Sequence, residues 1–584
     1  MRRTKIICTL GPASSTEDVI EKLARGGMNV ARLNFSHGDH ASHGATIDAV
    51  KRVRERLGLP IGILLDTKGP EIRLGNFAGG HVSLVEGQRF TLSTEPCEGD
   101  AQCAMVNYRE LPQDAHAGDI ILLDDGLIQL RIDSIEDGKI HCTVMNSGVI
   151  SDHKKLTLPG VSVSLPGLTE QDKADLLFGI GKGVDFVAAS FTRQAQDILE
   201  VRQFLEQNGG KRIQVIAKIE NRQGINNADE IISVSDAVMV ARGDMGVEIP
   251  MEDVPVEQSR IIRSCAQHAT PVIVATQMLD SMIRNPMPTR AEVSDVAIAV
   301  QEGADCIMLS GETAAGKYPL EALSTMARVA ERIERSIDYR GRFQLQQSGE
   351  VGTVTGAISH AVCMSAMDLG AAAIVTCTKS GVTACAIAHH RPSSPILATT
   401  TEVSTFYHLS LIWGTQPLMT ANVSNTDDMI DDSVQAAVQA GLARNGDIVV
   451  ITAGVPVSRA GTTNLIKIHH VGELLIRGRG VGERAVSGTV CMALSPEEAA
   501  AKFRDGCILA VDATDNRYVP LLKRCAGIIT ADASPNGHAV VVGLALDIPV
   551  IFDAGNLPDA LQDGLLVTVD PKTGYVYKGR SALL

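Results

Sequence analysis

Two carboxylates and a lysine are the side chains whose types and spacing are best suited to chemistry. Glu220 follows the apolar run 214–218, and Asp244 follows the next apolar run, 237–241. If these runs are neighbouring parallel strands, both carboxylates lie at one edge, where they could hold Mg²⁺ together with water and substrate oxygens. Lys218 precedes Glu220 by two residues, so an extended backbone points both side chains to the same side.

A lysine beside a carboxylate-bound Mg²⁺ suits phosphoryl transfer, because catalysis there is mostly positioning and neutralising the charge of the migrating group. Arg32 and Arg73 flank the same edge, and a guanidinium is suited to bidentate contact with phosphate oxygens. The alternatives are a buried structural ion pair for the carboxylates and surface salt bridges for the arginines. Spacing alone leaves both possibilities open.

The elements that must position these residues are short apolar runs, which mostly end in a polar or small residue. Continuous apolar runs fit parallel strands buried on both faces. Helical patterns separate most of them, and residues 14–17 and 169–172 have the form of a capping box. Eight strand–helix units predict an α/β fold with a (β/α)₈ barrel; a doubly wound open sheet is the alternative. The runs are residues 5–9, 29–33, 61–66, 185–189, 214–218, 237–241, 271–275 and 306–309.

The interval between the third and fourth runs predicts an inserted small β-barrel lid domain, because residues 81–94 and 119–145 alternate apolar and polar side chains. Residues 341–351 are polar and indicate a linker to a C-terminal α/β domain, with strands at 373–376, 396–399 and 447–453. The glycine-rich run 478–482 lacks dinucleotide-loop spacing and is interpreted as a hinge before an extra C-terminal α/β domain. The expected domains are 1–69 with 168–340 (barrel), 70–167 (lid), 341–474 (α/β) and 475–584 (extra).

Composition excludes several classes of protein. The net charge of −15 argues against nucleic acid or an anionic membrane as the main partner. Twelve cysteines without a C-x-x-C pair encode neither a disulfide framework nor a zinc ribbon. Without an apolar signal or a membrane-spanning run, a cytoplasmic location is expected. His37, His40 and His43 have H-x-x-H spacing, but the zincin glutamate is missing and we expect no metal there.

Longer motifs resemble the pyruvate kinase family. The match runs in order from Thr4 to about His470. The last segment resembles the extra domain of some bacterial members, which is similar to the phosphohistidine domain of enzymes that use phosphoenolpyruvate. The motifs are NVARLNFSHG at 29–38, LDTKGPEIR at 65–73, AKIEN at 217–221, MVARGDMG at 239–246, ATQML at 275–279 and LSGETA at 309–314.

The resemblance implies the reaction phosphoenolpyruvate + ADP + H⁺ → pyruvate + ATP, the last step of glycolysis. It implies Mg²⁺ (or Mn²⁺) and K⁺ as cofactors. Lys218 would stabilise the phosphoryl group in flight, Arg32 would grip the phosphate of phosphoenolpyruvate, and Thr276 would lie near the point where enolpyruvate is protonated. The implied sets are Arg32, Lys218, Gly243, Asp244 and Thr276 for substrate, Glu220 and Asp244 for Mg²⁺, Asn34, Ser36, Asp66 and Thr67 for K⁺, and Asn34, His37, Arg73 and Lys154 for nucleotide.

Two departures from the family pattern stand out. The family usually has glycine after the lysine matched by Lys154, and this chain has Lys155. His538 matches a phosphate-carrying histidine, yet Asn536 and Gly537 replace the usual Thr-Ser, so we expect a structural residue.

Regulation and assembly are also implied by the resemblance. Thr378, Ser380, Gly381 and Thr383 resemble a loop that binds the phosphate of an allosteric effector, here a sugar phosphate or AMP, and the family implies a homotetramer.

Two rival functions remain at this stage. A barrel lyase or aldolase would need the carboxylates but neither Lys218 nor a nucleotide lid. A non-catalytic regulatory protein on a decayed scaffold would have lost the charged residues named above, and all of them are present.

Overall fold

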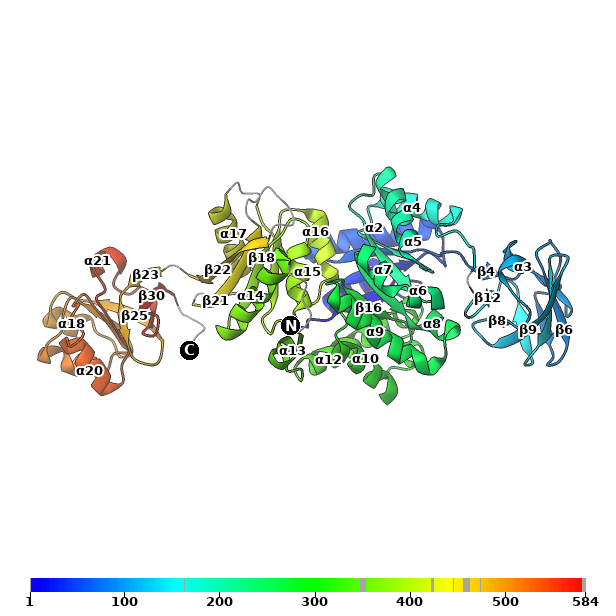
Figure 1. The fold of residues 1–584 in the computed structure, drawn as a ribbon. Helices are drawn as coiled ribbons and strands as arrows, with labels where there is room; N and C mark the ends of the chain where they lie inside the picture. Colours follow the sequence, from blue (N-terminus) through cyan, green and yellow to red (C-terminus); the bar gives the residue numbers. More distant parts are fainter. Residues whose placement is uncertain are drawn as a thin grey trace. The chain divides into compact units, whose positions relative to one another are not determined.

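The computed structural model describes residues 2–161, 163–346, 353–421, 425–444, 446–454, 463–472 and 474–579 (Figure 1). They divide into two units. One consists of Met1–Val351, Ala384–Arg391 and Glu402–Pro417, and the other of Gly352–Thr383, Pro392–Thr401 and Leu418–Leu584. Within the described part of the chain, no helix has the length and apolar character needed to cross a membrane.

The first unit contains a closed barrel of eight strands that pair in parallel, which confirms the predicted fold and excludes the open sheet. Every residue of several strands is buried, which explains the continuous apolar runs. In barrel order the strands are β1 (Lys5–Thr9), β17 (Cys306–Leu309), β16 (Val272–Ala275), β15 (Ala237–Ala241), β14 (Gln214–Ile219), β13 (Phe186–Ala189), β3 (Gly62–Asp66) and β2 (Val30–Asn34).

Amphipathic helices pack their apolar faces on the barrel strands in one continuous core. The capping box at residues 169–172 is confirmed, since Thr169 and Asp172 cap α4 reciprocally. The one at 14–17 is wrong: Thr16 is the N-cap of α1, and Ser14 instead accepts a hydrogen bond from the Gly11 amide. The longer barrel helices are α1 (Glu17–Arg25), α2 (His40–Leu57), α4 (Glu170–Lys182), α5 (Ala195–Gln207), α9 (Val254–Gln267), α10 (Arg290–Glu302) and α12 (Pro319–Glu334).

Short helices follow several barrel strands and carry residues of the mouth. They are α6 (Arg222–Asn226), α7 (Ala228–Val234), α8 (Arg242–Glu248) and α11 (Gly311–Ala314). The predicted linker 341–351 is in part helical, because α13 (Tyr339–Gln346) extends into it; residues 347–351 lie outside the described residues.

The insert folds around its own apolar core. Its strands form a seven-stranded sheet, ordered β4-β12-β8-β9-β10-β6-β7, and a two-stranded sheet of β11 and β5. The pairs are antiparallel as expected, except that β6 and β7 run parallel. The strands are β4 (Ile72–Arg73), β5 (His81–Leu84), β6 (Arg89–Ser93), β7 (Cys103–Met105), β8 (Ile120–Leu123), β9 (Ile128–Glu136), β10 (Lys139–Val144), β11 (Gly148–Ser151) and β12 (Lys155–Thr157).

A five-stranded sheet, ordered β20-β19-β18-β21-β22, confirms the strands predicted after Thr353. Its buried core strand β18 pairs in parallel with both β19 and β21. The strands are β18 (Ala373–Cys377), β19 (Ile396–Thr400), β20 (Thr415–Met419), β21 (Ile448–Gly454) and β22 (Thr463–His470), and the helices are α14 (Val354–Asp368), α15 (Val382–His389), α16 (Val403–His408) and α17 (Thr426–Gln439).

The last segment forms an eight-stranded sheet, ordered β23-β30-β29-β25-β26-β27-β28-β24. The hinge predicted at 478–482 is wrong, since this run contains strand β24, which pairs with β28. Its glycines instead allow neighbouring backbone segments to pack closely. A Cβ on Gly480, for example, would clash with the Pro571 carbonyl oxygen. The strands are β23 (Leu474–Arg477), β24 (Arg479–Val481), β25 (Val486–Met492), β26 (Ile508–Val511), β27 (Gly527–Thr530), β28 (Val550–Phe552), β29 (Leu566–Asp570) and β30 (Tyr575–Lys578), with helices α18 (Pro496–Lys502) and α20 (His538–Leu546).

Candidate functional site

Side chains at the carboxyl ends of adjacent barrel strands form a buried charged cluster. Lys218 Nζ lies 3.3 Å from Asp66 Oδ1 and 3.2 Å from Glu220 Oε2, and it donates a 2.7 Å hydrogen bond to Ser190 Oγ. Arg32 donates through Nε to Asp66 Oδ2 at 2.6 Å and through Nη1 to Thr9 Oγ1 at 2.9 Å. Four predicted residues from β2, β3 and β14 are therefore in one network, Arg32, Asp66, Lys218 and Glu220.

The charges within this network shift the pKa values of Asp66 and Lys218, its central ion pair. Burial would raise the pKa of Asp66, but the positive charges of Arg32 and Lys218 hold it below its usual value. Burial would lower the pKa of Lys218, but Asp66 and Glu220 raise it above the ordinary lysine value. Lys218 is thus a permanently charged ammonium inside the barrel mouth.

Glu220 lacks full compensation for its charge. Oε1 accepts a 2.6 Å hydrogen bond from the Phe191 amide, whereas Oε2 is buried and makes no hydrogen bond. Burial raises the pKa of this carboxyl to about 7, against the opposing effect of Lys218. A buried carboxylate oxygen without a hydrogen-bond donor is a suitable ligand for a hard cation.

Asp244 lies in the first turn of α8 and has a different environment. Its Oδ1 is 2.5 Å from Lys155 Nζ, which comes from strand β12 of the lid domain. Burial would raise the pKa of Asp244, but Lys155 and Lys218 hold it below its usual value. In the described ranges, no three His, Cys, Asp or Glu side chains form a group that could hold a metal by themselves. Glu220 and Asp244 fit Mg²⁺, which usually takes one or two protein carboxylates and completes its shell with water and substrate oxygens.

Thr276 follows β16 with a φ of +67°, which is unusual for a β-branched residue. Its Oγ1 accepts a 2.8 Å hydrogen bond from the Gly243 amide and donates to the Ala275 carbonyl at 2.6 Å. Arg242 Nη2 donates to the Thr276 carbonyl at 2.7 Å. The strained loop and the first turn of α8 are therefore joined, so Gly243, Asp244 and Thr276 lie together as predicted; strain of this kind is typical of functional sites.

The four residues expected around K⁺ lie at the ends of two adjacent strands. Asn34 and Asp66 are register partners in the β2–β3 pair. Asn34 Oδ1 accepts a hydrogen bond from the Ser36 amide at 3.2 Å, and Thr67 Oγ1 donates to the Ala188 carbonyl at 3.2 Å. Hydroxyl, amide and carboxylate oxygens are thus concentrated at this corner of the mouth.

Only part of the predicted nucleotide set lines one cavity. His37 and Arg73 line a cavity of about 1060 Å³. Arg73 is held by Glu71 Oε2 at 2.6 Å and by the His153 carbonyl at 2.7 Å. Asn34 is not among the lining residues, and Lys154 instead pairs with Asp124 within the lid domain at 2.9 Å.

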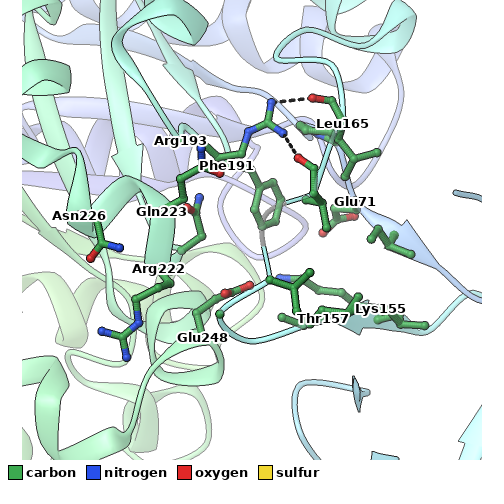
Figure 2. Close-up of a pocket in the computed structure, with 18 residues that line it drawn as sticks. Glu71, Lys155, Thr157, Leu165, Phe191, Arg193, Arg222, Gln223, Asn226 and Glu248 are labelled. Atoms are coloured by element: carbon green, nitrogen blue, oxygen red, sulfur yellow. Dashed lines mark hydrogen bonds between the residues drawn. The ribbon is translucent and has the colours of Figure 1, made fainter. Parts of the chain in front are cut away.

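Two residues of the site were not singled out from the sequence. Ser190 bonds Lys218, Asp66 and the Thr67 carbonyl, and a polar residue directly after the run 185–189 was the available signal. Lys155 was noted only as a departure from a pattern, and it is the lysine of the inserted domain that contacts Asp244. Figure 2 shows Lys155, Phe191 and Glu248 lining one pocket. The volume of this pocket is about 210 Å³, and Arg193, which also lines it, donates a 2.7 Å hydrogen bond to the carbonyl of Leu165.

The effector-loop candidates lie between β18 and the start of α15. Thr378 and Thr383 are buried, and their hydroxyls bond the Gly381 amide at 2.9 Å and Thr463 Oγ1 at 2.7 Å. Ser380 is exposed, and Gly381 has a φ of +86°. The loop presents Ser380 and holds the two threonines internally.

Histidines considered for metal or phosphate have other partners. His40 Nε2 lies 2.6 Å from Asp175, and His43 Nε2 contacts the His37 carbonyl at 2.7 Å. His538, at the start of α20, contacts Thr514 Oγ1 through Nδ1 at 2.9 Å and Asn516 Oδ1 through Nε2 at 3.3 Å. Both ring nitrogens of His538 therefore contact neutral polar groups.

Comparison with known proteins gives a consistent result along the chain. Family models match residues 1–323 (pyruvate kinase, barrel domain), 356–469 (pyruvate kinase, alpha/beta domain) and 503–574 (PEP-utilising enzyme, mobile domain). A pyruvate kinase of Sporosarcina psychrophila is 48% identical and one of Geobacillus stearothermophilus 47%, each over 100% of both chains. A crystal structure of a pyruvate kinase from Cryptosporidium parvum has a TM-score of 0.77 and 38% identity, covering 80% of this chain and 96% of that one.

The environment of Glu220 predicts a pH-dependent stability effect in metal-free protein. Its folded pKa is raised, so the contribution of Glu220 to stability is fully present below the ordinary glutamate pKa and is lost as pH rises through about 7. Glu220→Gln copies the protonated form, and at pH 8 it should be more stable than wild type by on the order of 2 kcal/mol, a difference that shrinks at pH 5. Thermal unfolding with a chelator at both pH values measures this.

The matched control is Asp66→Asn, for which the sign is reversed. Because the folded pKa of Asp66 is lowered, its charge contributes stability above its ordinary pKa, and the variant should be less stable at pH 8. Equal destabilisation by both substitutions would contradict the assignment of an uncompensated charge to Glu220.

Proposed function

Since the chain belongs to the pyruvate kinase family, we propose a specific division of labour at its barrel mouth. The protein is a phosphotransferase that moves the phosphoryl group of phosphoenolpyruvate to ADP and yields pyruvate and ATP, the closing step of glycolysis. A lyase would need neither a buried lysine nor a lid, and full-length relatives named pyruvate kinase favour the kinase. The observation that carries the assignment is the permanently charged Lys218 held between Asp66 and Glu220.

Lys218 stabilises the phosphoryl group during transfer. Its ammonium is fixed by three oxygens of the mouth, so no reorganisation is needed when negative charge develops on the migrating group. Arg32 holds the phosphate of phosphoenolpyruvate, and its position is fixed because Asp66 and Thr9 take two of its donors. The remaining N–H donors of Arg32, on Nη1 and Nη2, are left for phosphate oxygens.

Glu220 and Asp244 hold the divalent cation, Mg²⁺ or Mn²⁺, which when bound neutralises charge on phosphoryl and substrate oxygens. Asn34, Ser36, Asp66 and Thr67 hold K⁺, which when bound adds a positive charge beside the phosphate. Support comes from Glu220 Oε2, which makes no hydrogen bond, and from the adjacent ends of β2 and β3.

Thr276 and the Gly243 amide position the carboxylate of the substrate. The hydroxyl of Thr276 is oriented by that amide and lies on a loop whose conformation Arg242 fixes. From this place Thr276 is suited to stand near the carbon at which enolpyruvate is protonated. His37 and Arg73 contact the nucleotide in the larger cavity, with Asn34 and Lys154 joining when the lid domain adjusts.

Regulation, assembly and location complete the proposal. A sugar phosphate or AMP binds the loop of Thr378, Ser380, Gly381 and Thr383 and favours the active state. The protein assembles as a homotetramer in the cytoplasm, where its twelve cysteines stay reduced thiols. We retain the domain limits 1–69 with 168–340, 70–167, 341–474 and 475–584.

Replacing Lys218 tests the catalytic assignment. Lys218→Met keeps the aliphatic stem and removes the charge, so kcat should fall by several orders of magnitude while the KM for phosphoenolpyruvate changes little. A coupled pyruvate assay with ADP, Mg²⁺ and K⁺ measures both. The exposed Lys173→Met serves as the control and should be neutral. A Lys218→Met enzyme that keeps more than about a tenth of wild-type turnover defeats the assignment.

Replacing K⁺ tests the monovalent site. Glu71 occupies the position where K⁺-independent members carry lysine, and here it pairs with Arg73 at 2.6 Å. A carboxylate supplies no positive charge, so activity should be largely lost when a bulky organic cation replaces K⁺. The variant Glu71→Lys should depend less on K⁺. Full wild-type activity without K⁺ refutes the proposal.

The C-terminal histidine gives a third test. Because Thr514 and Asn516 occupy both ring nitrogens, we expect His538 to be structural. His538→Ala should keep a near-normal kcat, and incubation with phosphoenolpyruvate should leave no acid-labile phosphate on the chain. Phosphohistidine at this residue in the wild type, absent from the alanine variant, would overturn this expectation.

A further inference from the structure

Lys154, directly before β12, and Lys155, the first residue of β12, have opposite surroundings. Side chains alternate between the faces of a strand, so neighbouring lysines point in opposite directions. Lys154 is 38% exposed and pairs with Asp124 inside the lid domain at 2.9 Å. Lys155 is 14% exposed and reaches the barrel, where its Nζ lies 2.5 Å from Asp244 Oδ1. Only the second lysine therefore connects the lid domain with the proposed metal ligands.

Lys155 is fixed by more than a single ion pair. Its ammonium lies 4.7 Å from the centroid of the Phe191 ring, within the range of a cation–π contact. The amide of the same Phe191 donates to Glu220 Oε1 at 2.6 Å. Phe191 thus contacts both the lysine and the second carboxylate of the metal pair. Figure 2 shows Phe191 and Lys155 lining the same pocket.

Each carboxylate of the pair has one lysine ammonium beside it. Lys218 lies 3.2 Å from Glu220 and Lys155 lies 2.5 Å from Asp244. A divalent cation bound to Asp244 would be only a few ångströms from the Lys155 ammonium, and like charges at such separation repel strongly at a partly buried site. Both cations cannot keep this carboxylate oxygen.

We propose that Lys155 is a positioning residue of the lid domain that occupies Asp244 until a divalent cation displaces it. Metal binding is then coupled to release of β12 from the barrel mouth. This role rests on the proposed function of Glu220 and Asp244 as metal ligands. In this role the positive charge of Lys155 determines both the metal affinity and the position of the lid domain. An uncharged residue at this place could not compete with the cation.

Binding of Mn²⁺ alone tests the proposal. The full-length, metal-free protein is titrated with Mn²⁺ in K⁺ buffer, without phosphoenolpyruvate or ADP, and free Mn²⁺ is measured by electron paramagnetic resonance. Lys155→Met should bind Mn²⁺ about tenfold more tightly than wild type, because the competing charge is gone. Lys155→Arg should resemble wild type, and so should the matched control Lys154→Met.

Amide hydrogen exchange measures the release of β12 directly in the wild-type protein. Mn²⁺ should increase amide exchange in β12 of the wild type and leave that of Lys155→Met unchanged. Equal or weaker Mn²⁺ binding by Lys155→Met, or β12 exchange in the wild type that does not rise with Mn²⁺, overturns the role of Lys155. If neither wild type nor Lys155→Met binds Mn²⁺, the metal assignment itself fails and this role with it.

Discussion

The contact on which the barrel mouth depends is the ion pair between Lys218 and Asp66. Both side chains are almost fully buried, and Asp66 is shared with Arg32. Removing one partner of a buried pair typically lowers the free energy of unfolding by about 3–5 kcal/mol, because the remaining charge is buried without a partner and without water. The fold can bury this network because the ends of parallel strands meet at one rim and supply Ser190 and backbone amides as further partners.

This network is close to neutral before any ligand arrives, and that constrains what can bind. Arg32 and Lys218 offset Asp66, while Glu220 is left with an oxygen that makes no hydrogen bond. A metal cation beside Glu220 and a phosphoryl group beside Arg32 and Lys218 add charges of opposite sign, so the two together keep the site near neutral. Lys155 stands in for the cation at Asp244.

Sequence reasoning predicted the barrel because its signal is local and repeated: strands buried on both faces must be continuously apolar, as β1 and β15 are. The candidate site residues were predicted by the same rule, since barrels place functional side chains after the strands. Sequence reasoning failed where one local pattern is compatible with two structures. Gly478 and Gly480 suggested a hinge, but their lack of a side chain allows β24 to approach Phe552 and Pro571 closely.

The contact between Lys155 and Asp244 could not be predicted from one sequence. The resemblance directs attention to Lys154, and alternation along β12 predicts only that the neighbouring lysine points the other way. Which of the two reaches Asp244 depends on how β12 pairs with β4 and β8 and on how the inserted domain is held against the barrel. One contact that holds it is Arg193, a barrel residue that binds the carbonyls of Val163 and Leu165. Contacts between segments so distant in sequence leave no periodic signal. A charge at a strand end is therefore predictable, whereas its partner from an inserted domain is not.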